Sequence, residues 1–513
     1  MLSFPGSLEL TTSCILCILV IYLLRVGTVS IVRRRHLAAL PVPDTGDVDP
    51  KQAFVTNGRD VLRKALQAHV GAFAIQTSNG IRAVIRHSLA EEYTKSRSIS
   101  GVETLRVDGF ADYPGFQAAK VAIDSPLLRN MLVRRLSPSL ATVRNDMRDE
   151  LNLASHDILG QSRDWTHTVV QRTVGALAAR LVSRVLVGMP LCHDERWVRA
   201  TEEYTRLNFA AASDLRQVRS FLRPIKHWWL SSCVELRRTA QVARLLIADE
   251  LSRRETMDNE SREKSKPPTV RADCLQWLLE ESRSLKVSPD IAAAQLHLSL
   301  IGVQTVTHSL GQALRLLCEH PEWISKLRQE AARTLQRHSG WTKAAIYELK
   351  YHDSFLKESQ RLTSGYLALN SIVTHDMVFS DGTSLPRGTR CFLEAGLLNE
   401  DHYSEPYSFD PTRFYSAKGD NQSRSAAPKS NYSSATVEHL GFGFGPRACP
   451  AQYFSGRFWA SDLMKMALAH LVLHYDWQLE PEDDSLPLIE IESIQLIHPE
   501  ARLRVRLAMP VQM

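Results

Sequence analysis

One cysteine of the chain lies in a glycine-rich stretch that favours a thiolate. The stretch FGFGPRACPA runs from Phe442 to Ala451 and is followed by a strongly helical segment. Gly443 and Gly445 permit backbone turns that bring amide N–H groups close to the sulfur of Cys449. Pro450 suits the first position of a helix, whose positive end lowers the pKa of a thiol placed before it. These residue types predict a cysteine anion that is able to bind a metal.

The surroundings of Cys449 indicate which metal this is. No other Cys or His stands nearby at the spacing of a chelating pair, so a zinc site is disfavoured. A single axial thiolate is sufficient for haem iron. Arg447 carries a planar guanidinium that can pair with a haem propionate. The alternative is a structural cysteine in a chance glycine-rich loop.

A long apolar helix is the second element with a chemical candidate. Ser288 suits the cap and Pro289 the first position of a helix that continues without a breaker to His320. The helix spans roughly 32 residues, or about 48 Å. Its middle, SLIGVQTVTHS, is apolar on nearly every face, which predicts a helix inside the protein. Thr305 in this stretch is either a hydroxyl that faces a site or a core threonine bonded back to its own helix.

These stretches together resemble the cytochrome P450 family. The cysteine loop of that family has the pattern F-x-x-G-x-R-x-C-x-G, which this chain matches except at the last glycine, where Ala451 stands. The resemblance implies the family's fold, mainly α with small β-sheets, and a haem b held between a long central helix and the cysteine loop. Cys449 is then the axial thiolate and the metal ligand. The residues expected to bind the haem are Phe442, Gly443, Gly445, Arg447 and Cys449.

The resemblance also assigns a role to an ion pair. In YHDSFLKESQRLTSG, Glu358 and Arg361 stand three apart on a helical pattern, which by itself is an ordinary surface feature. In the family such an E-x-x-R pair is buried behind the haem and is joined by an arginine from a P-x-R-F motif. Pro411 to Phe414 supply that motif, with Arg413 as its arginine. We expect a structural network of these three charged residues that sets the cysteine loop against the core.

On the central helix, the resemblance places Gly302, Val303, Gln304 and Thr305 on the family's A-G-x-[D/E]-T signature. It implies that Gly302 leaves room for oxygen and that the Thr305 hydroxyl binds iron-bound dioxygen. Gln304 departs from the usual acid, and an amide supplies no acidic proton. The catalytic residues expected from this helix are Gly302, Gln304 and Thr305, with proton delivery through Thr305 and water.

Three further positions leave alternatives open. Ser371 stands where many relatives carry an arginine that binds a propionate, so another basic residue is expected to substitute. Arg134 or Arg135 falls where a second propionate ligand often lies, but a helix surface charge explains either equally well. The cluster FLRPIKHWWLSSC, from Phe221 to Cys233, is either an entrance lip that dips into a membrane or ordinary core packing.

The composition is that of a folded, compact protein. Of 513 residues, 44% are hydrophobic and 23% are charged, and the excess of Lys plus Arg over Asp plus Glu is only 62 to 56. This excess is spread along the chain, so no nucleic-acid partner is expected. Helical patterns dominate, with few β-like pieces such as GAFAIQ and IRAVIRHS.

The N-terminal segment predicts a membrane anchor. Leu10 to Leu24 carry no charge, and the apolar character resumes from Val26 to Val32 after the single Arg25. Basic residues follow the segment and none precedes it, which orients the body toward the cytosol. We expect a single-pass anchor and basic stop at 1–36, a Pro-containing linker at 37–50 and one catalytic domain at 51–513, on the endoplasmic reticulum membrane. A cleaved signal peptide is the alternative.

The implied activity is a monooxygenase that inserts one atom of O2 into a C–H bond of a hydrophobic small molecule. EHLGFGFGPRACPA and SFDPTRF resemble fungal members that oxidise terpenoids and other secondary metabolites. The chain has no flavin or nicotinamide fingerprint, so NADPH acts only through a separate NADPH–cytochrome reductase, with cytochrome b5 as a second candidate donor. The alternatives are a haem-thiolate isomerase or dehydratase, and an inert haem-binding protein.

Overall fold

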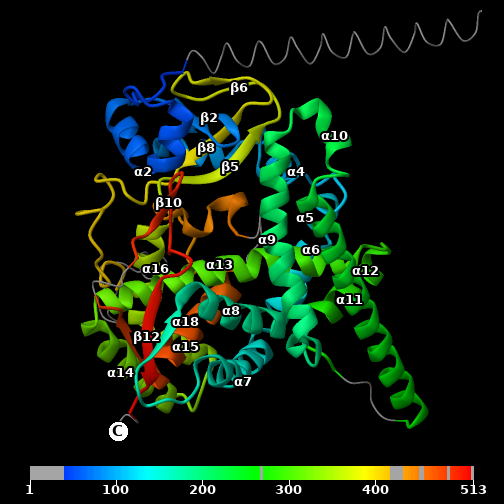
Figure 1. Ribbon diagram of the computed structural model, residues 1–513. Coiled ribbons are helices and arrows are strands. Elements are labelled where there is room, and N and C mark those ends of the chain that lie inside the picture. The colour runs from blue at the N-terminus through cyan, green and yellow to red at the C-terminus, as the bar shows by residue number, and fades with distance from the viewer. Residues whose placement is uncertain (1–39, 266–269, 416–430, 450–455, 482–485, 510–513) are drawn as a thin grey trace, which may run out of the picture.

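The computed structural model describes residues 40–265, 270–415, 431–449, 456–481 and 486–509. The predicted anchor at 1–36, and the helix start predicted at Pro450, lie outside these residues. Helices make up most of the molecule, and the strands form small sheets that lie in different parts of it (Figure 1). The mainly α class with small β-sheets is therefore confirmed. No helix in the described part of the chain is both long and apolar enough to cross a bilayer.

Helix α13, Ile291–Glu319, crosses the middle of the molecule (Figure 1). Its cap is Asp290, whose carboxylate accepts a hydrogen bond from Ala293 N at 2.9 Å. The predicted start at Ser288 and Pro289 is therefore wrong by two residues, because the Asp290 carboxylate satisfies a free N–H of the first turn. The helix packs against α5 (Gln117–Asp124), α8 (Val170–Leu186) and α18 (Gly456–His474).

Most of the remaining helices pack around α13 in the large helical core, whereas α2 and α3 pack against the five-stranded sheet. The remaining helices are α2 (Pro50–Ala68), α3 (Ala90–Lys95), α4 (Gly101–Asp108), α6 (Leu127–Met131), α7 (Leu140–Leu159), α9 (Glu195–Gln217), α10 (Arg223–Lys226), α11 (Ser231–Glu263), α12 (Cys274–Leu285), α14 (Glu322–Arg337), α15 (Lys343–Glu348) and α16 (Lys350–Thr363). Between α6 and α7, Leu132–Leu136 form one π-helical turn, a form that is often found at functional positions.

A five-stranded sheet forms the other core and has the order β1-β2-β8-β5-β3. Its strands are β1 (Phe73–Thr77), β2 (Gly80–Ile85), β8 (Arg390–Glu394), β5 (Leu367–Val373) and β3 (Ile99–Ser100). The two β-like pieces named from the sequence are β1 and β2. Strand β5 changes register between Ala368 and Ser371, and Leu369 within this irregularity has a φ of 50°.

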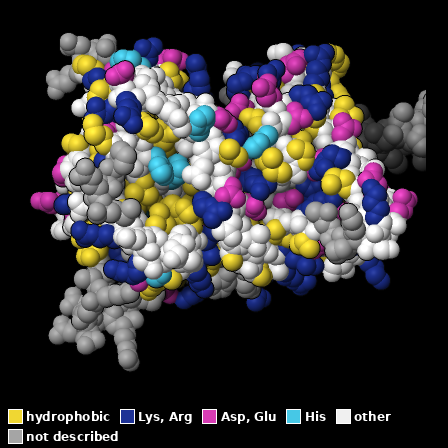
Figure 2. Space-filling view, turned by 90° about the horizontal axis from the view of Figure 1, so that it is seen from below, with side chains coloured by type: hydrophobic (Ala, Val, Ile, Leu, Met, Phe, Trp, Pro, Cys, Tyr) yellow, Lys and Arg dark blue, Asp and Glu magenta, His cyan; other side chains and the backbone are white. Residues whose placement is uncertain are grey.

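Three smaller sheets complete the described part of the fold. They are β4 (Thr166–Val169), β12 (Arg502–Leu507) and β9 (Tyr475–Leu479) in one sheet, β10 (Ile489–Ile491) with β11 (Ile494–Leu496), and β6 (Met377–Val378) with β7 (Ser384–Leu385). On the face shown in Figure 2, basic and acidic side chains are interspersed.

Candidate active site

The middle of α13 has one open face inside the protein. Between Ala292 and Cys318 every residue is buried or half-buried except Ile301, Gln304 and Thr305, which are exposed. These three stand at positions i, i+3 and i+4, so they share one face of the helix. This face is therefore accessible to a bound molecule, while the rest of the helix is packed against protein.

The structure shows contacts of Thr305 and Gly302, two of the predicted catalytic residues, that could not be predicted from the sequence. Thr305 Oγ1 donates to Ile301 O at 2.7 Å, so its proton is held by the helix while its lone pairs stay free. A Cβ on Gly302 would lie 3.1 Å from Val182 and 3.9 Å from the ring of Trp459. Glycine at this position therefore has a packing reason, the close approach of α8 and α18, beside the expected one.

The cysteine loop is closed by backbone contacts. Cys449 N donates to Phe442 O at 2.7 Å, and a 3₁₀ turn at Gly445–Arg447 lies between them. Gly443 has a φ of 72°, and a Cβ there would lie 2.3 Å from Arg447 O. Gly445 has a φ of 54° with open space around it, so conformation alone favours glycine there.

Cys449 is exposed at the end of this loop, whereas the other five described cysteines are buried. The loop bridges the two cores, because Leu440 packs in the sheet cluster and Phe442 against the helical cluster. Although Cys449 is exposed at the surface of the loop, the protein atoms around its sulfur desolvate the thiol and raise its pKa, and the Arg457 guanidinium partly opposes this. The described loop does not by itself lower the pKa of the thiol, contrary to the prediction from its glycines. A bound metal ion deprotonates a coordinating thiol directly.

The structure brings the predicted charged network together. Glu358 and Arg361 on α16 have fully buried side chains and pair twice, Nε to Oε2 at 2.7 Å and Nη2 to Oε1 at 2.8 Å. Arg361 Nη1 also donates to Leu397 O at 2.8 Å and Pro406 O at 2.6 Å. Arg413 Nε reaches Glu358 Oε1 at 3.1 Å. Helix α16 and the segment of Arg413 therefore meet on one buried carboxylate.

The candidate propionate ligands fall in different places. Arg134 and Arg135 pair with Glu281 and Glu280 of α12 at 3.4 and 3.3 Å, which favours the reading of both as helix surface charges. Arg447 lies against Ser371, with Nη1 to Oγ at 3.1 Å. The contact between Arg447 and Ser371 could not be predicted from the spacing of these residues in the sequence.

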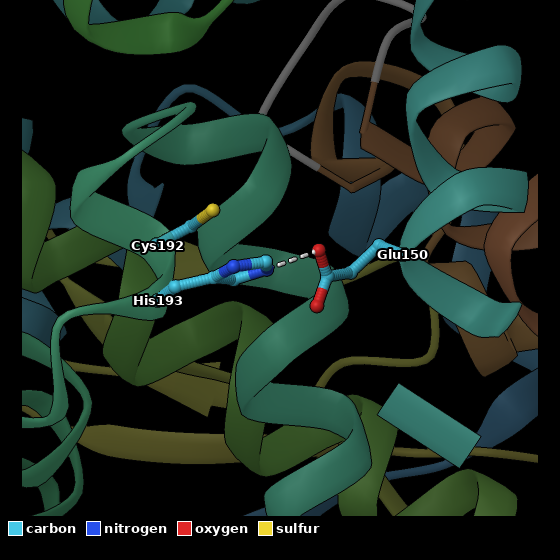
Figure 3. A group of neighbouring side chains, drawn as sticks. All are labelled: Glu150, Cys192 and His193. Carbon is cyan, nitrogen blue, oxygen red and sulfur yellow. Dashed lines mark hydrogen bonds and ion pairs between the residues drawn. The ribbon is translucent and has the colours of Figure 1, made fainter. Parts of the chain in front are cut away.

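A second cluster of possible ligands was not visible in the sequence. Glu150 of α7 and the neighbouring Cys192 and His193 have ligand atoms within 4.8 Å of one another (Figure 3). Glu150 is already neutralised, because Arg180 Nε donates to Oε1 at 2.5 Å and His193 Nε2 lies 2.7 Å from Oε2. Burial also raises the pKa of Cys192 to about 12. This arrangement satisfies a buried carboxylate and has a structural role.

Residues 127–505 match the family model described as Cytochrome P450. The chain belongs to the cytochrome P450 family. Among similar proteins, "Cytochrome P450 monooxygenase bsc2" of Alternaria brassicicola is 30% identical over 474 residues, 92% of this chain and 88% of the relative. "Cytochrome P450 monooxygenase pyr3" of Aspergillus fumigatus is 32% identical over 459 residues, 89% and 86%. "Cytochrome P450 monooxygenase adrA" of Penicillium rubens is 30% identical over 441 residues, 85% and 84%.

As a cytochrome P450, the protein is a haem-thiolate oxidoreductase of the monooxygenase class. Its residues fit such a group. The haem is an apolar ring with two carboxylates. It requires an open face, which α13 offers, a cysteine that is accessible, as Cys449 is, and a cation for the carboxylates, which Arg447 supplies.

Proposed function

We propose that the haem of this cytochrome P450 lies between the open face of α13 and Cys449, with the Cys449 sulfur as its axial ligand. The observation that carries this proposal is the exposure of Ile301, Gln304 and Thr305 on a helix that is enclosed on both sides of them. When bound, the haem supplies oxygen activation, which electron donation from the thiolate promotes.

Thr305 and Gln304 on α13 then have different roles in proton delivery. Thr305 donates its own proton to Ile301 O, so its oxygen is left as an acceptor that would hold a water at this face of α13. Gln304 has both a donor and an acceptor on its amide and can orient that water, but it cannot supply an acidic proton. Protons are therefore delivered through water that these two side chains hold in place.

The substrate that we infer is a hydrophobic small molecule of the terpenoid type. Ile301 is 44% exposed on the open face, which offers an apolar contact directly beside the polar pair. The reaction consumes the C–H substrate, O2, two electrons and two protons, and it yields the alcohol and water. The electrons come from NADPH through a separate reductase. A screen of terpenoids for changes in the haem absorption spectrum tests the substrate class, and a set of linear fatty acids is the matched comparison.

Thr305→Ala is expected to uncouple the enzyme. Without the Thr305 oxygen, water is no longer held where a proton is needed, and reduced oxygen leaves as hydrogen peroxide. Product per NADPH should fall severalfold while hydrogen peroxide rises and carbon monoxide binding stays near wild type. Thr305→Ser keeps the hydroxyl and should stay close to wild type. Unchanged coupling in Thr305→Ala would remove the residue from the mechanism and favour the isomerase or dehydratase alternative.

We also propose that the protein is held on the endoplasmic reticulum membrane with its body in the cytosol, through an anchor at 1–36. An exposed apolar cluster around α10 supports a second contact with the bilayer. Its members are Phe221, Ile225, Trp228 and Trp229, which are 68%, 55%, 51% and 72% exposed. Helix α10 lies at the same end of the molecule as α2, where the described chain begins (Figure 1).

Deletion of residues 1–36 is expected to release most of the protein from membranes and to leave a fraction that high salt or carbonate removes. Trp228→Ser with Trp229→Ser in the same truncation should release that fraction, because the exposed rings no longer enter the interface. Membrane flotation measures both steps, with Phe209→Ser as a control, since Phe209 is 53% exposed on α9 and is not a member of the α10 cluster. Carbonate-resistant binding of the truncated protein would show that another segment holds it.

A further inference from the structure

The guanidinium of Arg447 is fixed by segments that are far apart in the chain. Its Nη2 donates to Ile99 O at 2.6 Å and to Ser96 O at 3.2 Å, beside strand β3. Its Nη1 donates to Ser371 Oγ at 3.1 Å on β5. Its plane lies over the ring of Tyr93, 5.1 Å from the ring centre. Three of its five N–H groups are thereby used, and the other two have no acceptor within the described ranges.

The Ser371 hydroxyl can accept a hydrogen bond from Arg447 because it donates its own proton to another group. The Ser371 hydroxyl donates to Leu369 O at 2.8 Å, which leaves the oxygen as an acceptor for the guanidinium. Ser371 is 1% exposed, so this oxygen has no competing bulk water. The donor and the acceptor sides of one hydroxyl thus join strand β5 to the cysteine loop.

The Leu369 carbonyl also accepts a hydrogen bond from a second hydroxyl, that of Tyr93. Tyr93 OH donates to Leu369 O at 2.7 Å. Burial raises the pKa of Tyr93 well above its usual range, so the hydroxyl stays a neutral donor. Leu369 has a φ of 50°, a conformation that costs a residue with a side chain about 1 kcal/mol or more. Two buried hydrogen bonds on its carbonyl offset this strain and fix the turn that aims Ser371 at Arg447.

We propose that Ser371 is a positioning residue that holds Arg447 with two N–H groups directed at a carboxylate of the bound haem. Ser371 thus assists haem binding through Arg447, where relatives that this chain resembles place an arginine directly. The proposal rests on the haem site of the proposed function. The two hydroxyls differ in one respect: the Ser371 hydroxyl accepts a hydrogen bond from Arg447, whereas the Tyr93 hydroxyl contacts Leu369 and Cys391, and only the Tyr93 ring meets Arg447.

The test compares Ser371→Ala, Ser371→Thr and Tyr93→Phe in the full-length holoprotein. Ser371→Ala removes a buried bond to a charged donor, so haem transfer to an excess of apo-globin should become about tenfold faster. The ferric–ferrous midpoint potential should become more negative, because the carboxylate charge near the iron is compensated less well. Ser371→Thr keeps the hydroxyl and should restore both values.

Tyr93→Phe is the matched control. It removes the other hydrogen bond on Leu369 O but keeps the ring beside Arg447 and the bond from Ser371 to Arg447, so it should lower thermal stability and change haem transfer and potential much less than Ser371→Ala does. Equal effects of Tyr93→Phe and Ser371→Ala on the potential would overturn the proposal, as would wild-type haem transfer in Ser371→Ala. If wild type itself lacks the thiolate band with carbon monoxide, the proposed function fails instead.

Discussion

Cys449→Ser is expected to abolish the red-shifted absorption band that the reduced, carbon monoxide-bound wild type shows. The band requires a thiolate on the iron, and a serine hydroxyl at this place stays neutral. The loop should keep its shape, because Cys449 N to Phe442 O and the turn at Gly443 do not involve the sulfur. The reduced carbon monoxide difference spectrum measures the loss, with total haem measured in parallel.

Another cysteine is not expected to replace it. Cys391 and Cys318 are buried in the sheet and helical clusters, and burial raises the pKa of their thiols to about 11 and about 12. Cys318→Ser is therefore a suitable control and should keep the full band. A wild-type band in Cys449→Ser would show that the ligand assignment is wrong.

Arg361→Ala should leave little folded, haem-loaded protein. The substitution removes the two-point partner of the fully buried Glu358 carboxylate, which keeps only Arg413 and the Asp410 N–H, and it removes the donor to the carbonyls of Leu397 and Pro406. Breaking a buried pair in this way costs about 3–5 kcal/mol, against a total stability of about 5–15 kcal/mol for a typical protein. Arg361→Lys should rescue poorly, because an ammonium group cannot make the two parallel bonds and reach both carbonyls. Urea unfolding and haem content per protein measure the effect.

Arg413→Ala serves as the graded comparison for this network. Arg413 makes one 3.1 Å contact with Glu358 and its side chain is 12% exposed, so water can replace it in part. We expect a loss of about 1–2 kcal/mol, well below that of Arg361→Ala. Equal losses in the two variants would mean that the network does not depend on the paired geometry of Arg361.

The sequence located the site through residues whose chemistry is local. Gly443 and Cys449 stand close together in one loop, and Glu358 and Arg361 on one helix, so spacing alone predicts their contact. The cap of α13 was misplaced because Ser288 and Asp290 are both good caps, and only the fold decides between them. Burial raises the pKa of the Cys449 thiol, an effect that depends on the packing around the loop and has no signal in the local sequence.

Contacts between segments that are far apart in the chain could not be predicted from the spacing of residues in the sequence. Tyr93 and Leu369 are 276 residues apart, and the positive φ of Leu369 appears in a residue type that does not favour it. Ser371 could be recognised only as a missing arginine, which left open what takes its place. The answer depends on which strand pairs with which, and that is a property of the whole sheet.

The packing of α13 also limits which of its residues can be substituted to change substrate selectivity. Gly302 abuts Val182, so side-chain volume added there is resisted by the helix behind it. Ile301, one position earlier, lies on the exposed face where we propose the haem cavity, so it can be exchanged for larger or smaller side chains without opening a void in the core. A laboratory-evolution library that randomises Ile301 and leaves Gly302 fixed therefore samples cavity shape while it spares the helix contact that supports the site.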